Sequence, residues 1–105
     1  MAAPFEALAE PNRRRILDLL RVAERAVNDL VNELAVSQPA VSKHLRVLRE
    51  AGLVEVRTDA QRRIYRVRTE PLRAVDEWLE PYRRLWESRL DDLERHLDVM
   101  PDDED

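Results

Sequence analysis

The sequence contains no cysteine, which excludes disulfide bonds, thiolate metal sites and cysteine nucleophiles. Its one glycine, Gly52, leaves little material for a glycine-rich phosphate loop or a nucleophile elbow, so we do not expect an enzyme. No apolar run approaches the length of a membrane span, and the first residues lack the basic start and apolar stretch of a secretory signal. We therefore expect a cytoplasmic protein without membrane contact.

The charged side chains are unevenly distributed along the chain, whose net charge is −4. Residues 37–69 carry eight basic and three acidic side chains, a net charge of +5. Residues 1–36 carry five basic and six acidic side chains, and residues 70–105 carry five basic and thirteen acidic side chains, so both segments have a net negative charge. Only the middle segment has the charge expected of a surface that faces phosphates. Double-stranded DNA is therefore the expected partner of this segment.

Residues 37–52 predict a helix with two distinct faces. Ser37 is a favourable N-cap, Pro39 lies in the first turn where its missing N–H costs nothing, and Gly52 suits a left-handed C′ position. The helix is expected over about residues 38–51, with an apolar stripe formed by Val41, Leu45 and Leu48.

The other face of this helix carries an amide, a hydroxyl and basic groups. Such groups read base edges and bind phosphates in the major groove of DNA. His44 lies at the border of the two faces, and a structural or phosphate-binding role is favoured for it over base reading or metal binding. The polar face predicts DNA contacts from Gln38, Ser42, Lys43, Arg46 and Arg49, and His44 is included in the predicted DNA-binding set through a phosphate contact.

Apolar periodicity predicts three helices before this one: a short helix interrupted by Pro11, and helices over residues 12–24 and 27–34. A short helix, a tight turn and a second helix with an exposed polar face form a helix-turn-helix. The arginines at 13–15 are interpreted as a solvated face, although Arg13 or Arg14 could reach a phosphate.

After Gly52 the apolar pattern becomes alternating, which predicts a two-stranded hairpin over about residues 53–68. A hairpin placed directly after a recognition helix forms a wing. Its tip would lay Gln61, Arg62 and Arg63 against flanking phosphates or the minor groove. The alternative is that these arginines only keep a sheet edge soluble.

From Pro71 onward apolar residues recur every three or four positions, which predicts one long helix over about residues 71–98, kinked at Pro81. A helix of that length would outrun the core of so small a domain. We expect it to pair with the same helix of a second subunit; the alternative is that it folds back on its own domain. The predicted dimer interface comprises Phe5, Leu8, Leu72, Val75, Trp78, Leu79, Tyr82, Trp86, Leu90, Leu93 and Leu97.

Taken together, these segments resemble the ArsR-type family of winged helix-turn-helix repressors from bacteria and archaea. The likeness is carried by LAEPNRRRILDLL, VSQPAVSKHLRVLREAGLVEV, RRIYRV and WLEPYRRLWESRLDDLERHL, which cover nearly the whole chain. The resemblance implies a dimeric, operator-binding transcriptional regulator. It also implies base contacts from Gln38, Pro39, Ser42 and Lys43, and DNA-backbone contacts from Arg46 and the wing.

Metal-sensing members of that family carry either a cysteine pair, at positions matching the region around residues 28–30, or paired His and Asp residues on the last helix. Neither set is present here. Asp92 and His96 are spaced for half a zinc site, but an exposed helix pair is the favoured interpretation. We therefore expect no metal and no other cofactor.

The sequence thus predicts a mainly α-helical protein with a small β-hairpin wing. It would form one winged helix-turn-helix domain over residues 1–100 that dimerises through its N- and C-terminal helices, followed by an acidic disordered tail over 101–105. The expected function is that of a dimeric repressor acting on an inverted-repeat operator, autoregulatory and not metal-sensing. Two alternatives remain open: a winged-helix protein-interaction module without DNA binding, and a sensor whose small-molecule inducer binds around Trp78, Tyr82 and Trp86.

Overall fold

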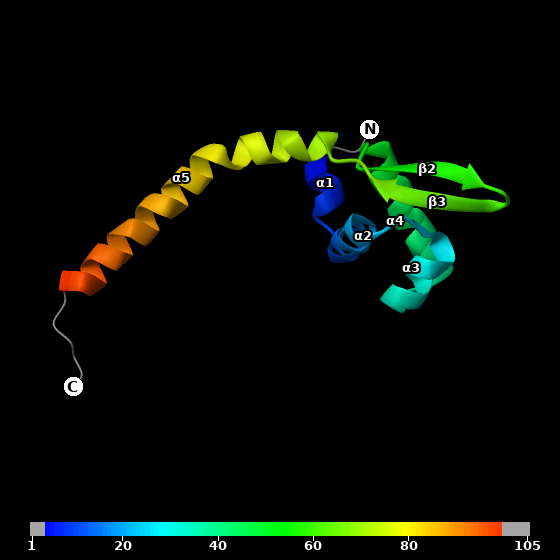
Figure 1. Ribbon diagram of the computed structural model, residues 1–105, viewed down its shortest axis with the longest axis horizontal. Coiled ribbons are helices and arrows are strands. Elements are labelled where there is room, and N and C mark those ends of the chain that lie inside the picture. Colours follow the sequence, from blue (N-terminus) through cyan, green and yellow to red (C-terminus); the bar gives the residue numbers. More distant parts are fainter. Residues whose placement is uncertain (1–3, 100–105) are drawn as a thin grey trace. The chain divides into compact units, whose positions relative to one another are not determined.

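The computed structural model describes residues 4–99, so the predicted tail at 101–105 lies outside the described residues. Figure 1 shows the order of the elements along the chain. They are α1 (Pro4–Leu8), α2 (Pro11–Val22), β1 (Arg25–Ala26), α3 (Val27–Leu34), α4 (Gln38–Glu50), β2 (Val54–Asp59), β3 (Arg62–Val67) and α5 (Glu70–Val99).

The chain divides into two compact units, one ending at Val75 and the other beginning at Asp76. The first unit contains α1 to α4, the sheet and the start of α5, and the second contains the rest of α5. The single domain predicted for residues 1–100 stays a prediction.

The predicted helix-turn-helix is confirmed as α3 and α4. The helix α3 ends at Leu34, and its C-cap residue Ala35 adopts a left-handed conformation with φ of 55°. Ser37 then caps α4 by accepting a hydrogen bond from the Ala40 amide at 3.3 Å. At the other end of α4, the amides of Gly52 and Leu53 donate to the carbonyls of Arg49 and Leu48, both at 2.9 Å. These two bonds form a Schellman motif around the left-handed Gly52, as the sequence predicts.

The apolar stripes of the helices form the core of the first unit. Val41, Leu45 and Leu48 of α4 are buried together with Ile16 of α2 and Leu30 of α3, all at 0–1% exposure. Each of these residues comes from a position that the 3.6-residue periodicity assigns to an inward face. The orientation of α4 is therefore set by the burial of its stripe.

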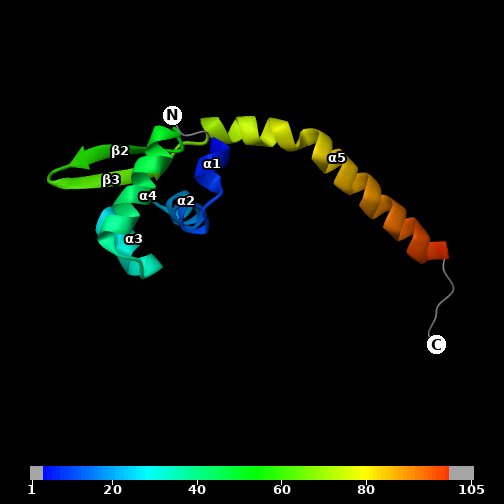
Figure 2. The ribbon, with the colours of Figure 1, turned by 180° about the vertical axis from the view of Figure 1, so that it is seen from behind.

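The wing is confirmed, with one addition to the predicted hairpin. Strands β2 and β3 pair antiparallel from Val54 opposite Val67 to Asp59 opposite Arg62, and the two-residue strand β1 pairs with the other edge of β3. The resulting sheet has the order β1-β3-β2. Figure 2 shows the hairpin from behind. The tip contains no glycine, and Ala60 adopts a left-handed conformation there with φ of 58°.

Two neighbouring arginines hold the short helix α1. Arg13 donates from Nε to the Ala7 carbonyl at 2.7 Å and from Nη2 to the Glu6 carbonyl at 3.2 Å, while Arg14 donates from Nη1 to the Leu8 carbonyl at 2.7 Å. Carbonyls at a helix C-terminus lack partners within the helix, and cations stabilise that end. Arg14 and Arg15 are exposed, in agreement with the interpretation of this run as a solvated face, but Arg13 and Arg14 also hold the end of α1.

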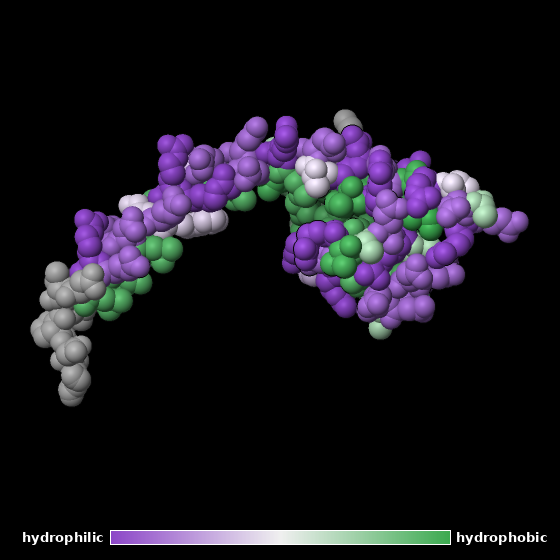
Figure 3. All heavy atoms as spheres, viewed as in Figure 1, coloured by the Kyte–Doolittle hydropathy of each residue, from purple (hydrophilic) through white to green (hydrophobic). Residues whose placement is uncertain are grey.

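The helix α5 is one continuous helix through Pro81, so this proline does not divide it. Most of its apolar side chains are exposed, and Figure 3 shows them gathered along one side of the helix. Among the predicted interface residues, Leu8, Leu72, Val75 and Leu79 are partly buried. The exposed ones are Phe5, Trp78, Tyr82, Trp86, Leu90, Leu93 and Leu97.

The left-handed alanine in the turn of the helix-turn-helix leads to a stability prediction. A left-handed conformation costs a non-glycine residue about 1–2 kcal/mol, and substitution by glycine removes this cost. The greater freedom of glycine in the unfolded chain takes back about 0.4–1 kcal/mol of the resulting gain in stability. Ala35→Gly should therefore raise the free energy of unfolding by about 0.5–1 kcal/mol, measured by urea denaturation. Ala23→Gly is the matched control because Ala23 has an extended backbone with φ of −162°, and it should not stabilise the protein. Equal shifts in both variants would contradict the assignment of strain to Ala35.

Candidate nucleic-acid interface

The outward face of α4 and part of β3 line an open groove. Gln38 and Pro39 lie at the beginning of the helix, and Arg63 and Tyr65 come from the wing. The groove is lined by Val27, Gln38, Pro39, Ser42, Lys43, Arg46, Arg49, Arg63 and Tyr65. Members of the predicted DNA-binding set that lie up to 25 residues apart in the sequence, Gln38 and Arg63, are therefore brought to one surface.

A second hollow continues this groove towards the tip of the wing. Its lining shares Val27, Gln38 and Arg63 with the groove and adds Asn28, Gln61 and Arg62. Together the two hollows contain every predicted DNA-binding residue except His44. Val27, Asn28 and Tyr65 are not among the residues predicted from the sequence. The position of Asn28 at the exposed start of α3 is a signal that could have indicated it.

The basic side chains of the groove carry uncompensated charge. Among the described side chains of residues 4–97, no ion-pair partner is found for Lys43, Arg46, Arg49 or Arg63. Other arginines of the wing are paired, as the contact of Arg66 with Glu55 shows. Positive charge that is not neutralised within the protein is available to bind the phosphates of a nucleic acid.

Two arginine–carboxylate contacts brace the wing. Arg57 donates from Nη2 to Glu24 Oε1 at 2.8 Å, and this hydrogen bond and the charge of Glu24 raise the pKa of Arg57. Arg62 Nη2 lies 3.3 Å from Asp29 Oδ2, which also accepts a hydrogen bond from the Ala26 amide at 3.1 Å. Strands β2 and β3 are thus each in contact with a carboxylate of the residues that precede and begin α3.

His44 is not brought into the groove. Its side chain is 17% exposed, and its Nε2 lies 3.1 Å from Glu10 Oε2 while its Nδ1 lies 3.5 Å from Arg13 Nη1. Glu10 in turn caps α2 by accepting from the Asn12 amide at 2.9 Å. His44 therefore connects the recognition helix to the start of α2, which agrees with the structural role that the sequence favours.

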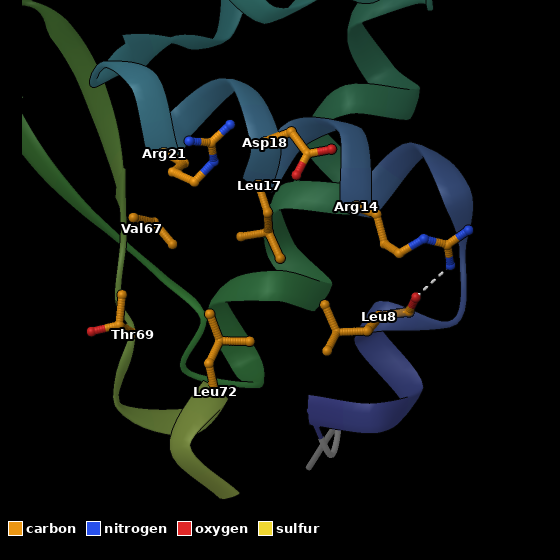
Figure 4. Close-up of a pocket in the computed structure, with 8 residues that line it drawn as sticks. All are labelled: Leu8, Arg14, Leu17, Asp18, Arg21, Val67, Thr69 and Leu72. Atoms are coloured by element: carbon orange, nitrogen blue, oxygen red, sulfur yellow. Dashed lines mark hydrogen bonds between the residues drawn. The ribbon is translucent and has the colours of Figure 1, made fainter. Parts of the chain in front are cut away.

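A separate cavity of about 330 Å³ lies within the first unit, between α1, α2, the end of β3 and the first turn of α5. Figure 4 shows Leu17, Val67 and Leu72 pointing into it, with Arg14, Asp18 and Arg21 along its α2 edge. Leu8 and Thr69 complete the lining.

Metal ligands do not converge anywhere in the described part of the chain. Among residues 4–97, whose side chains the structure describes, there is no group of three or more His, Asp or Glu side chains that could hold a metal ion. No helix in the same range has the length and apolar character needed to cross a membrane.

A helix-turn-helix followed by a hairpin wing, with unpaired cations along the second helix, defines a winged helix-turn-helix DNA-binding protein. The chain belongs to the ArsR family of transcriptional regulators, and residues 10–56 match the family model described as "Bacterial regulatory protein, arsR family". Its function is therefore that of a DNA-binding transcriptional regulator and not of an enzyme.

Individual relatives match most of the chain. The HTH-type transcriptional regulator Rv2034 of Mycobacterium tuberculosis is 37% identical over 94% of this chain and 90% of its own length. The transcriptional repressor SdpR of Bacillus subtilis is 31% identical over 71% of this chain and 83% of its own length. Among solved structures, an ArsR family transcriptional regulator, RHA00566, superimposes with a TM-score of 0.69 at 32% identity, over 80% of this chain and 87% of that chain.

The position of His44 leads to a prediction that separates a structural role from a DNA contact. His44→Ala should lower the free energy of unfolding by about 1–2 kcal/mol, because Glu10 and Arg13 each lose a partner in a partly buried site. Ser42→Ala is the control on the same helix, since Ser42 is exposed, and its effect should stay within about 0.5 kcal/mol. The measurement is urea denaturation without DNA. An unchanged stability of His44→Ala would argue against the structural role.

Proposed function

We propose that the protein is a dimeric repressor that inserts α4 of each subunit into successive major grooves of an inverted-repeat operator. The observation that carries this proposal is the polar face of α4, where an amide and a hydroxyl lie beside cations without ion-pair partners in the described chain. Twofold symmetry implies half-site centres about 10 base pairs, or roughly 34 Å, apart.

The side chains of the groove divide into two roles. Gln38 and Ser42 have donors and acceptors suited to base edges, whereas Lys43, Arg46 and Arg49 suit the phosphate backbone. Arg63 and the wing tip would contact the backbone beside the major groove or the neighbouring minor groove. His44 is left out of the DNA-contacting set, because its ring nitrogens face Glu10 and Arg13.

The exposed stripe of α5 supports a dimer. Trp86 and Leu90 are 54% and 60% exposed, and the rings of Trp78 and Tyr82 are in contact with a centroid distance of 4.8 Å. Soluble proteins rarely leave such contiguous apolar surface in water, and aromatic residues are enriched at interfaces. We therefore expect the stripe of α5 to pack against a second copy of the chain, since an operator with two-fold symmetry is bound by a protein with two-fold symmetry.

Repression is supported by the naming of a relative, since SdpR of Bacillus subtilis is described as a transcriptional repressor. The operator region of the protein's own gene is the first target to test. Purified protein should protect an inverted repeat there from nuclease digestion, against random competitor DNA, with a steep dependence on salt. Equal protection of random DNA at both low and moderate salt would oppose the proposal.

The division into base-reading and phosphate-binding groups generates a paired prediction. Arg46→Gln should weaken binding to every sequence and reduce the slope of log affinity against log salt by about 0.9, as one phosphate contact is lost. Gln38→Ala should instead cost about 1–3 kcal/mol at particular base pairs of the operator and relax specificity there. Fluorescence anisotropy with an operator series at two salt concentrations measures both. A uniform loss of affinity in Gln38→Ala would show that Gln38 does not read bases.

The proposed interface generates a prediction about assembly. Leu90→Glu places a charge on the exposed stripe, where its burial in a dimer would be strongly unfavourable. This variant should be monomeric by analytical ultracentrifugation and should lose the cooperative binding of the two half-sites. Ser88→Glu is the control, because Ser88 is exposed on the opposite face of α5, and this variant should remain dimeric. A dimeric Leu90→Glu variant would place the interface elsewhere.

A further inference from the structure

We propose that the cavity between α1, α2, β3 and the first turn of α5 is an effector site for a small apolar carboxylate, and that its occupancy reaches the recognition helix through Arg14, α1, Arg13 and His44. The effector site lies wholly within the first unit and is separate from the DNA-binding groove. Ligand binding itself does not depend on the proposed function, whereas the effect on DNA does.

The interior of the cavity suits an apolar group. Leu8, Leu17, Val67 and Leu72 come from four different elements and form its walls (Figure 4). Three of these side chains are only partly buried, although they pack against the core. The volume of about 330 Å³ lies within the range of small-molecule sites. An alkyl chain would remove the remaining apolar surface of these walls from water.

The edge of the cavity selects the charge of the ligand. Arg14, Asp18 and Arg21 lie one turn apart along α2, and their sum is one positive charge. The side chains of Asp18 and Arg21 have no hydrogen-bond or ion-pair partner among the described side chains of residues 4–97. One aspartate cannot neutralise two guanidinium groups, so the edge favours an anionic head over a cationic one. A carboxylate can accept two parallel hydrogen bonds from an arginine, which makes it the fitting head group.

The same edge is joined to α1 by a hydrogen bond from Arg14, and a bound carboxylate would compete for this donor. Arg14 Nη1 donates to the carbonyl of Leu8, the last residue of α1, at 2.7 Å. A carboxylate bound at the edge is a stronger acceptor for Arg14 than this carbonyl, because its bond is charge-assisted on both sides. Ligand binding would therefore draw the Arg14 guanidinium towards the carboxylate and weaken one of the bonds that hold the C-terminus of α1.

From α1 the contacts continue to the recognition helix. Arg13 holds the Glu6 and Ala7 carbonyls, and its Nη1 lies 3.5 Å from His44 Nδ1 on α4. The residues around His44 on α4 include Ser42, Lys43 and Arg46 of the DNA-binding groove. A shift of α1 would thus be carried through Arg13 to the helix that reads DNA. We expect an occupied cavity to lower operator affinity, as an inducer does.

Octanoate is the probe for ligand binding, measured by isothermal calorimetry on the full-length protein without DNA. Affinity should rise about fourfold for each methylene added from hexanoate to octanoate. Arg21→Gln should weaken octanoate binding by about tenfold or more, the loss expected for a charged hydrogen bond. Arg15→Gln is the matched control, because Arg15 lies on the same helix but bonds Asn12 outside the cavity, and it should bind as the unmodified protein does. The uncharged analogue octanol should bind to the Arg21→Gln and Arg15→Gln variants with the same affinity.

Several results would overturn the assignment of the cavity. The assignment would be wrong if octanoate did not bind. It would also be wrong if Arg21→Gln and Arg15→Gln lost the same amount of octanoate affinity, because that would indicate a general charge effect. Binding detected only in the monomeric Leu90→Glu variant would mean that a second copy of the chain occupies the cavity.

The transmission is tested on operator DNA once the operator is defined. Saturating octanoate should reduce operator affinity by about fivefold or more. In His44→Ala octanoate should still bind by calorimetry but should no longer change operator affinity, because the contact between α1 and α4 is removed. Transmission through His44 would be wrong if octanoate lowered the operator affinity of His44→Ala as much as that of the unmodified protein. It would also be wrong if octanoate bound to the unmodified protein without changing its operator affinity. Failure of operator binding itself, with octanoate binding intact, would count against the proposed function and not against the effector site.

Discussion

The burial of one stripe of α4 is the constraint on which the rest of the structure depends. Val41, Leu45 and Leu48 are inserted among the side chains of α2 and α3, so the helix cannot rotate about its axis without exposing them. The polar groups on the opposite face are then directed outward together. Ser37 and Gly52 set the two ends of this helix, which places Gln38 at its first turn. Packing on one side of the helix therefore determines what is available to DNA on the other.

Pairing of charges separates the arginines that shape the protein from those that are free to bind. Arg13, Arg14, Arg57 and Arg62 contact carbonyls or carboxylates of the chain, and each joins two elements. The cations along the groove have no such partners in the described part of the chain. An acidic protein can thus present a basic surface, because its net charge is an average over regions with different roles.

Periodicity predicted most of the fold, since apolar spacing and the capping residues Ser37 and Gly52 are local signals. The features that it missed depend on contacts between distant segments. Strand β1 has two residues, too few to show alternation, and exists only because β3 offers an unpaired edge. Arg13 resembles a solvated residue until Pro11 turns α1 back beside it. For the candidate site, the outward face of α4 was predictable from its own sequence, whereas the location of His44 behind the groove depended on the approach of Glu10 and Arg13.

Ala35 and Ala60 hold left-handed conformations in the two tight turns that frame the DNA-binding groove, one before α4 and one at the tip of the wing. Every alanine codon is one nucleotide away from a glycine codon, so relief of this strain is accessible to a single point mutation at either position. Natural proteins commonly retain such unused stabilising changes. Substitutions at the proposed base-reading residues of α4 that lower stability could therefore be compensated at two positions outside this helix, whether they arise in evolution or in a mutant library. The evolvability of operator specificity is therefore linked to two turns that need not touch a base.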